Sequence, residues 1–180
     1  MAVISWGKPR ILVKDLDTPE AAWVEFPTPS DGTTQLTTTK GQKQEAKIEG
    51  GENEDVRYGK NTYALALSIR AAKGRKKPIA DEDGVVAHNY ALALQPEDPE
   101  TPGLVMQKSA ASVEDAYTAA DGASWTYTFD ALKPGKDKKQ ITWGVITITE
   151  SAGTVSKVEC TPLDTAEGEK FELAPATPAE

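Results

Sequence analysis

Alternation of large and small, or apolar and polar, side chains recurs along most of the chain and is typical of β-strands. The clearest case is 63–69, where small residues form one face and large residues the other, namely Tyr63, Leu65, Leu67 and Ile69. Similar patterns predict strands at 11–13, 22–26, 90–94, 125–129, 141–148 and 155–160. The alternation changes phase at Gly144, which predicts a β-bulge there. The fold class predicted is mainly β, with antiparallel strands in a sandwich or barrel and at most one short helix.

The pentapeptide Tyr-Ala-Leu-Ala-Leu occurs twice, at 63–67 and at 90–94. Because nothing outside the pentapeptide repeats, we interpret it as two central strands with the same requirements rather than as an internal duplication. Large residues would point into the core, and alanine would stand where another layer lies close.

The tryptophans divide into two groups by sequence context. Trp125 and Trp143 lie within alternating strands and are expected in the core. Trp6 and Trp23 are candidates for exposed aromatic platforms.

Segment 112–120 is compatible with two structures. Ser112 is a possible N-cap and Gly122 a possible stop for a short helix. Asp121-Gly122 is also a strong hairpin signal, which would make the segment a strand turning back into 125–129. A single helical turn is also possible at 78–84.

A polar, threonine-rich segment at 33–55 favours an extended conformation but has almost nothing to bury. A long two-stranded ribbon of this kind is marginally stable alone in water, and its unpaired edge invites association. One interpretation is a plain surface hairpin with its turn at Lys40-Gly41-Gln42. The other is an arm that contacts a second copy of the protein.

In the second interpretation, Gly50 and Gly51 form a hinge between the arm and the core strand 63–69. Alternating lysines and glutamates would discourage random pairing while admitting a charge-matched partner. The residues expected at the subunit interface are Thr34, Leu36, Thr38, Lys40, Lys43, Glu45, Lys47 and Glu49.

Segments rich in proline, glycine and charge mark the loops. Three prolines within 96–102 exclude regular structure, and 132–139 reads as a turn between two strands. We expect one β domain at 1–163, with the arm at 33–55, and a flexible C-terminal tail at 164–180. Only Leu163, Phe171 and Leu173 would anchor that tail.

Composition narrows the function. The chain has 28 acidic and 20 basic residues, a formal net charge of −8, which argues against general nucleic-acid binding but not against DNA passing without sticking. A single cysteine excludes an internal disulfide and fits a reducing compartment. We find no signal-peptide pattern and no apolar run of the roughly 20 residues that a membrane helix needs, so no membrane partner is expected.

The residues for catalysis are few. His88 is the only histidine, and its position beside Asn89 favours a surface hydrogen-bonding role. Cys160 has no local activating group, and a pair of Cys160 with His88 is disfavoured. Carboxylates occur in runs typical of solvated loops, of which 81–84 is weakly suggestive of calcium. With no phosphate-binding or nucleophile motif present, we expect no enzyme, no catalytic residue, no metal and no cofactor.

A basic turn follows the strand 63–69 and contains Lys73, Arg75, Lys76 and Lys77. It lacks the interleaved aromatics of a nucleic-acid site, so a solvated turn is the plainer interpretation. A contact with an acidic patch on a neighbouring subunit is the alternative.

The order of these features resembles phage major tail tube proteins, which are related to the tube subunit of type VI secretion. The resemblance lies in the polar segment 32–41, the segment 45–51 and the core strand that follows at 63–70. It implies a small β-sandwich or barrel without catalytic machinery, six subunits closed into a ring by sheet pairing, and rings stacked into a tube. It also implies that 33–55 is an arm bridging neighbours, and that an electronegative lumen lets DNA slide. The family also has a flanking helix, for which this sequence offers only the undecided segment 112–120, and the resemblance does not explain the chain from about Asp164 onward.

We therefore expect a structural, self-assembling virion subunit of a bacteriophage or prophage tail, assembled in the bacterial cytoplasm. Its partners would be further copies of itself, possibly as a hexamer, and other tail proteins such as the tape measure. The alternative is an immunoglobulin-like β-sandwich that binds carbohydrate or mediates adhesion, with Trp6 or Trp23 as the contact.

Overall fold

The computed structural model describes residues 2–164 and 169–175. Strands account for all the regular structure, and no helix occurs in these residues. The strands are β1 (Arg10–Asp15), β2 (Val24–Glu25), β3 (Gln35–Thr39), β4 (Lys43–Lys47), β5 (Asn53–Tyr58), β6 (Thr62–Arg70), β7 (Val85–Gln95), β8 (Gly103–Thr118), β9 (Gly122–Ala131), β10 (Thr142–Ser151), β11 (Thr154–Pro162) and β12 (Phe171–Glu172). The predicted fold class, mainly β with antiparallel strands, is confirmed.

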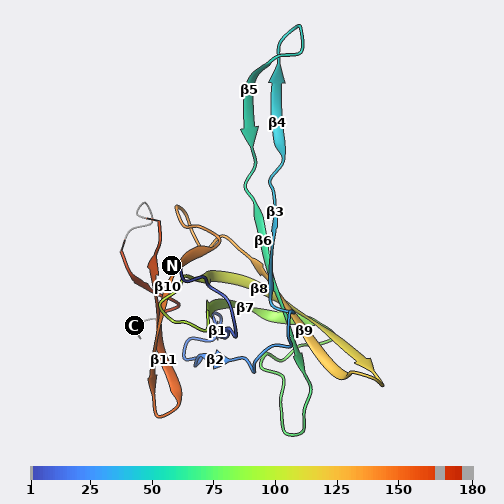
Figure 1. The fold of residues 1–180 in the computed structure, drawn as a ribbon, viewed down its shortest axis with the longest axis vertical. Coiled ribbons are helices and arrows are strands. Elements are labelled where there is room, and N and C mark those ends of the chain that lie inside the picture. The colour runs from blue at the N-terminus through green and yellow to red at the C-terminus, as the bar shows by residue number, and fades with distance from the viewer. Residues whose placement is uncertain (1, 165–168, 176–180) are drawn as a thin grey trace.

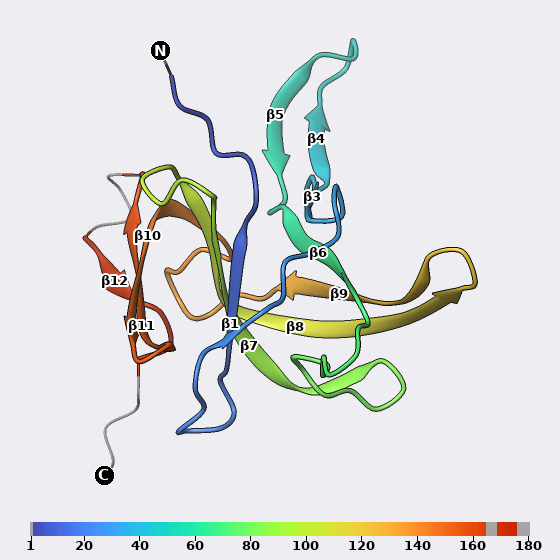
Figure 2. The same ribbon diagram turned by 60° about the horizontal axis from the view of Figure 1, so that its bottom comes forward.

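One large antiparallel sheet builds the body of the molecule, and a separate pair, β4 with β5, projects from it (Figure 1). The sheet branches at the long strand β8. Its first residues, Gly103–Val105, pair with β10, whereas Ser109–Thr118 pair with β9. The other edge of β8 pairs with β7, and β9 continues to β6 and β3. Figure 2 shows β8 and β9 curving away from β10 and β11, so the sheet folds over itself into layers.

Two hydrophobic cores lie on opposite faces of the central strands β1, β7 and β8. Alternation explains the division, since successive side chains of a strand point to opposite faces. Ile11 and Val13 of β1 face the first core with the side chains of β6 and β9, whereas Leu12 faces the second core with those of β10 and β11. The molecule is therefore a sandwich in which one sheet supplies both outer layers.

The repeated pentapeptide has the environment expected of central strands, most clearly in β7. Leu92 enters the first core, while Ala91 and Ala93 are fully buried in the second, where another layer packs against the strand. In β6, Leu65 and Leu67 are buried in the same way, but Tyr63, Ala64 and Ala66 remain half-buried. Phe26, Tyr127 and Phe129 fill the centre of the first core, with ring centroids 5.0–6.5 Å apart.

The hairpin alternative for 112–120 is the one observed. β8 runs through Thr118, turns over Ala119–Asp121 and returns as β9, with Gly122 in a left-handed conformation at φ 78°. The possible helical turn at 78–84 is absent; Glu82 instead forms an isolated bridge with Val85.

Two details of β10 differ from expectation. The register shift lies between Thr149 and Glu150, not at Gly144. Gly144 is required because the backbone of β11 lies close: an added Cβ would overlap the carbonyl oxygen of Thr161 and lie 2.7 Å from Cys160 Sγ. The parity of the strand therefore continues through Gly144, and Trp143 points outward rather than into the core.

Part of the predicted C-terminal tail belongs to the domain. Phe171 and Glu172 form β12, which pairs with β11, and Leu173 is fully buried in the second core. The remainder of that prediction, at 165–168 and 176–180, lies outside the described residues.

Candidate functional site

A long β-ribbon, the arm, rises from the body and consists of an inner and an outer part, one following the other along its length (Figure 1). The inner part pairs β3 with β6, from Gln35↔Ala66 to Thr39↔Thr62. The outer part pairs β4 with β5, from Lys43↔Tyr58 to Lys47↔Asn53. The chain therefore ascends through β3 and β4, turns, and descends through β5 and β6.

The tip of the arm is the turn between β4 and β5. Gly51 N–H donates to the carbonyl of Ile48, and Ile48 N–H donates to that of Glu52, at 3.1 and 3.0 Å. Gly50 and Gly51 supply the positive φ angles, 100° and 86°, that this turn requires. The predictions of a hairpin turn at Lys40-Gly41-Gln42 and of a hinge at Gly50-Gly51 before the core strand are therefore wrong in position.

The two parts of the arm meet at a waist formed by Gly41–Gln42 and Gly59–Asn61. Gly59 N–H donates to the carbonyl of Gln42 at 2.8 Å, and Gly41 N–H donates to the Asn61 side chain at 3.1 Å. The two backbones pass so closely that a Cβ on Gly41 would overlap the carbonyl group of Gly59. Glycine is thus needed here because the neighbouring backbone occupies the place of a side chain.

The outer part of the arm has no core. Every residue of β4 is exposed, and of β5 only Val56 is partly buried. Ion pairs join Lys43 and Lys47 to Glu45, and Lys40 Nζ lies 4.9 Å from the ring centroid of Tyr58. The hydrogen bond with Lys43 lowers the pKa of the Glu45 carboxyl and raises that of the Lys43 ammonium. Exposed pairs of this kind contribute little to stability, so the ribbon relies on its backbone ladder.

The predicted interface residues occupy two different environments. Leu36 is half-buried and packs against the first core, and Thr34 lies at the base of the arm. Thr38 and Lys40 are exposed higher up, and the remaining four, Lys43, Glu45, Lys47 and Glu49, lie on the exposed outer part. Leu36 therefore anchors the arm to its own domain, while the charged residues face solvent.

A groove of about 740 Å³ lies at the base of the arm, between the N-terminal segment and β3. Leu36, Leu65 and Leu104 contribute apolar lining, and two tryptophans stand at its wall. Trp6 is 76% exposed and Trp143 47% exposed. Trp23, expected as a surface platform, is only 8% exposed and packs in the second core. The second exposed tryptophan beside Trp6 is therefore Trp143, which was expected in the core.

The basic turn lies in the β6–β7 loop, at the end of the molecule opposite the arm tip (Figure 1). Lys77 differs from its neighbours because its ammonium contacts Asp115 at 2.7 Å and Asp81 at 2.8 Å. Hydrogen bonds to Asp115 and Asp81 raise its pKa. Asp81 also accepts the Gly84 N–H, so this carboxylate serves the fold of the loop. Lys73, Arg75 and Lys76 remain exposed.

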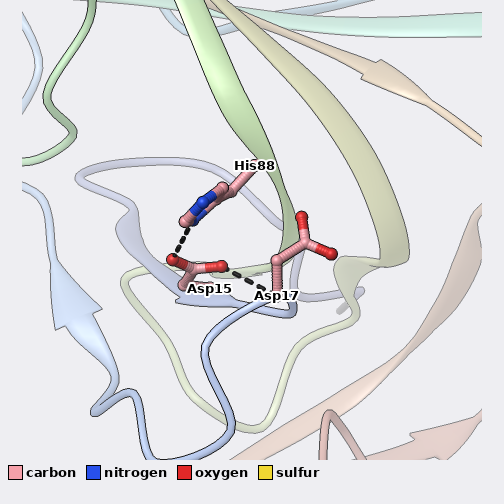
Figure 3. Close-up of side chains that lie close together, drawn as sticks. All are labelled: Asp15, Asp17 and His88. Carbon is pink, nitrogen blue, oxygen red and sulfur yellow. Dashed lines mark hydrogen bonds and ion pairs between the residues drawn. The ribbon is translucent and has the colours of Figure 1, made fainter.

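A cluster of Asp15, Asp17 and His88 lies where β1 ends beside β7 (Figure 3). Its candidate ligand atoms lie within 4.8 Å of one another. His88 Nδ1 lies 2.7 Å from Asp15 Oδ2, and Asp15 also accepts from Asp17 N–H and the Thr18 hydroxyl. Asp17 accepts from Asn89 N–H at 2.8 Å. Because both carboxylates already hold the loop after β1 against β7, the cluster acts as a structural clasp.

The clasp explains the electrostatics of these side chains. Burial favours the neutral form of Asp15, but hydrogen bonds from His88, Asp17 and Thr18 outweigh it and lower the carboxyl pKa. The same hydrogen bond, donated by His88 to Asp15, raises the pKa of His88. Cys160 is fully buried in the second core, whereas His88 is exposed at the surface, so the structure does not assemble the pair considered from the sequence.

The part of the chain that the structure describes contains no helix able to span a membrane. No family model matches the chain, and no characterised protein sequence matches it.

Proposed function

We propose that this protein is a structural subunit that assembles with copies of itself, as rings that stack into a phage or prophage tail tube. The observation that carries the proposal is the arm: β4 and β5 extend beyond the body, and all their residues are exposed except Val56, which is partly buried. An isolated two-stranded ribbon is marginal in water. A partner that covers it would supply the burial that it lacks.

The open edge of β3 supports the same proposal. Among the described residues β3 pairs with β6 alone, on one side, and its residues Gln35–Thr39 include no charge and no proline. Natural proteins commonly protect an exposed edge with such residues, with a bulge or with a covering segment. An unprotected edge offers backbone donors and acceptors to a strand of another copy.

A head-to-tail contact that closes gives a ring, and one that does not close gives a filament. Under this proposal the ring is a hexamer, the tape measure is among the further partners, and DNA passes through an acidic lumen. The assembly would form in the cytoplasm of a bacterial host and become part of the virion. The net charge of −8 fits passage without sticking.

The test removes the outer part of the arm and leaves the body intact. Residues 40–61 are replaced by Asn-Gly, so that Thr39 and Thr62, which are paired, are joined by a two-residue turn. We expect the variant to keep the far-ultraviolet circular dichroism of a folded β protein. We also expect it to stay monomeric at concentrations at which the full chain forms rings or tubes by electron microscopy and light scattering. Assembly by the shortened variant would refute the role of the arm.

A second candidate function is carbohydrate binding at the groove beside Trp6 and Trp143. Its support is that two exposed indole rings and several polar groups, among them Asp31 and Ser30, line one open groove. A glycan array would test it, with the double variant Trp6→Ala/Trp143→Ala as control. Binding that disappears in this variant would favour the second candidate over the first.

A further inference from the structure

The end of the arm carries acidic side chains that have no partner in the described structure. Glu49, Glu52 and Glu54 lie in or beside the tip turn, are exposed, and form no ion pair among the described residues. Within the described part of the chain, Asp55 forms an ion pair with Arg57 alone, at 3.1 Å. The backbone hydrogen bonds of the turn fix the end of the arm that carries these acidic residues, so negative charge is concentrated there.

The loop at the opposite end carries the complementary charge. Lys73 and Lys76 are exposed and make no ion pair within the described part of the chain, and Arg75 donates only to the carbonyl of Arg70, at 2.7 Å. The loop is held in place because Ala71 N–H donates to Ala123 and Arg75 N–H donates to Ala72. It therefore presents a preformed basic surface.

These two surfaces cannot neutralise each other within one molecule. The arm tip and the β6–β7 loop lie at opposite ends of the longest axis of the molecule (Figure 1). A head-to-tail arrangement of copies, however, brings unlike ends together, as a heterologous interface requires. Complementary charges at such a contact favour the correct partner and register.

We propose that the acidic arm tip of one copy, formed by Glu49, Glu52 and Glu54, contacts the basic loop of another copy, formed by Lys73, Arg75 and Lys76. This inference rests on the proposed self-assembly and names the surface on which the arm ends. Lys77 is not part of the contact, because Asp81 and Asp115 already neutralise it. The contact sets partner and register, while the larger surfaces of the arm and body supply the burial.

Charge reversal tests the pairing. The variant Glu49→Lys/Glu52→Lys/Glu54→Lys and the variant Lys73→Glu/Arg75→Glu/Lys76→Glu should each raise the concentration needed for assembly by about tenfold or more, measured by light scattering. A chain with all six substitutions should assemble again near the wild-type concentration. An equimolar mixture of the two triple variants should also assemble, because each supplies the surface that the other can bind.

A matched control separates this contact from a general effect of charge. Lys133→Glu/Lys136→Glu/Lys138→Glu makes the same change in net charge as the variant of the basic loop, but in another exposed loop, and should assemble like wild type. Raising sodium chloride from about 0.1 M to about 1 M shortens the screening length from about 10 Å to about 3 Å and should weaken assembly of wild type more than that of either triple variant.

The possible outcomes distinguish the two proposals. If wild type never assembles, self-assembly itself is refuted. If wild type assembles and the triple variants do so equally well, the arm has another docking surface and only this inference fails. Loss of assembly in both triple variants without recovery in the six-fold variant also overturns the pairing.

Discussion

The body and the arm are made of the same kind of strand but are stabilised differently. In the body, β6 places Leu65, Leu67 and Ile69 in a core where none is more than 1% exposed. In the arm, β3 and β4 have the same extended backbone, but neither contains a buried residue. The body is therefore stabilised by the burial of apolar side chains. The arm is stabilised by its backbone hydrogen bonds and, under the proposal above, by a partner that covers it.

The largest effect is expected for a cavity in the first core. Phe129 is fully buried and contacts Phe26 with a ring-centroid distance of 6.0 Å. Phe129→Ala should lower the free energy of unfolding by about 3–5 kcal/mol, measured by urea denaturation. The substitution Val56→Ala in the arm is the matched comparison and should change it by no more than about 0.5 kcal/mol. Equal losses would mean that arm and body form one cooperative unit.

A glycine in the body gives the next largest effect. Gly144→Ala places a methyl group against the backbone of Thr161, which is fixed by pairing between β10 and β11. We expect the free energy of unfolding to fall by about 1–3 kcal/mol, because a packed layer must shift. Gly135→Ala, in a loop where the nearest atom to the added Cβ is 3.9 Å away, is the control and should be tolerated.

Gly41, the glycine of the arm that lies closest to a neighbouring backbone, should matter much less for global stability than Gly144. Gly41→Ala creates a similar overlap, with the backbone of Gly59. Since the arm buries almost nothing, we expect global unfolding to change by less than about 0.5 kcal/mol. Amide hydrogen exchange in β4 and β5 should nevertheless become faster, as local opening is easier. A large loss of global stability would show that the waist is coupled to the core.

The smallest effect on the free energy of unfolding is expected for the clasp formed by Asp15, Asp17 and His88 at the edge of the body. The pKa of His88 is raised above 6.5, so its contribution is complete below that pH and is lost as pH rises through the folded pKa. The pKa of Asp15 is lowered below 3.8, so its contribution is present above that pH and is lost on acidification. The pair should therefore stabilise the fold most between these values.

His88 is the only histidine, so nuclear magnetic resonance can follow its titration without overlap. We expect the imidazole to titrate above 6.5 in wild type and closer to 6.5 in Asp15→Asn. A titration that is unchanged in Asp15→Asn would mean that the ion pair does not form in solution.

Sequence predicts the body better than the arm, for a physical reason. Strands with one buried face must keep a fixed parity, so 63–69 and 90–94 are recognisable from alternation alone. The arm has no buried face, and its pairing depends on Gly59 and Asn61 meeting Gly41 across the ribbon. The local sequence does not show that Lys40-Gly41-Gln42 lies at the waist, where two strands of the arm pass each other, or that Gly50-Gly51 forms the tip turn.

Which tryptophans are buried cannot be predicted from the local sequence alone. Trp143 follows the alternation of its strand, but Gly144, not Trp143, faces the neighbouring backbone. Trp23 lies in a short segment next to a proline, yet the second core closes over it. Which face of a strand is covered depends on layers contributed by distant parts of the chain. The groove at the base of the arm cannot be predicted from local sequence for the same reason, since its lining comes from distant segments.

The continuity of β6 has a mechanical consequence. Its first residues pair with β3 in the arm, and Ala64–Arg70 pair with β9 in the body, so a single strand spans both. A pull along the arm therefore loads the ladder between β6 and β9 parallel to the strands. The hydrogen bonds of that ladder share the load in shear rather than opening one after another. A force applied to the inner part of the arm would reach the centre of the first core along this one continuous strand.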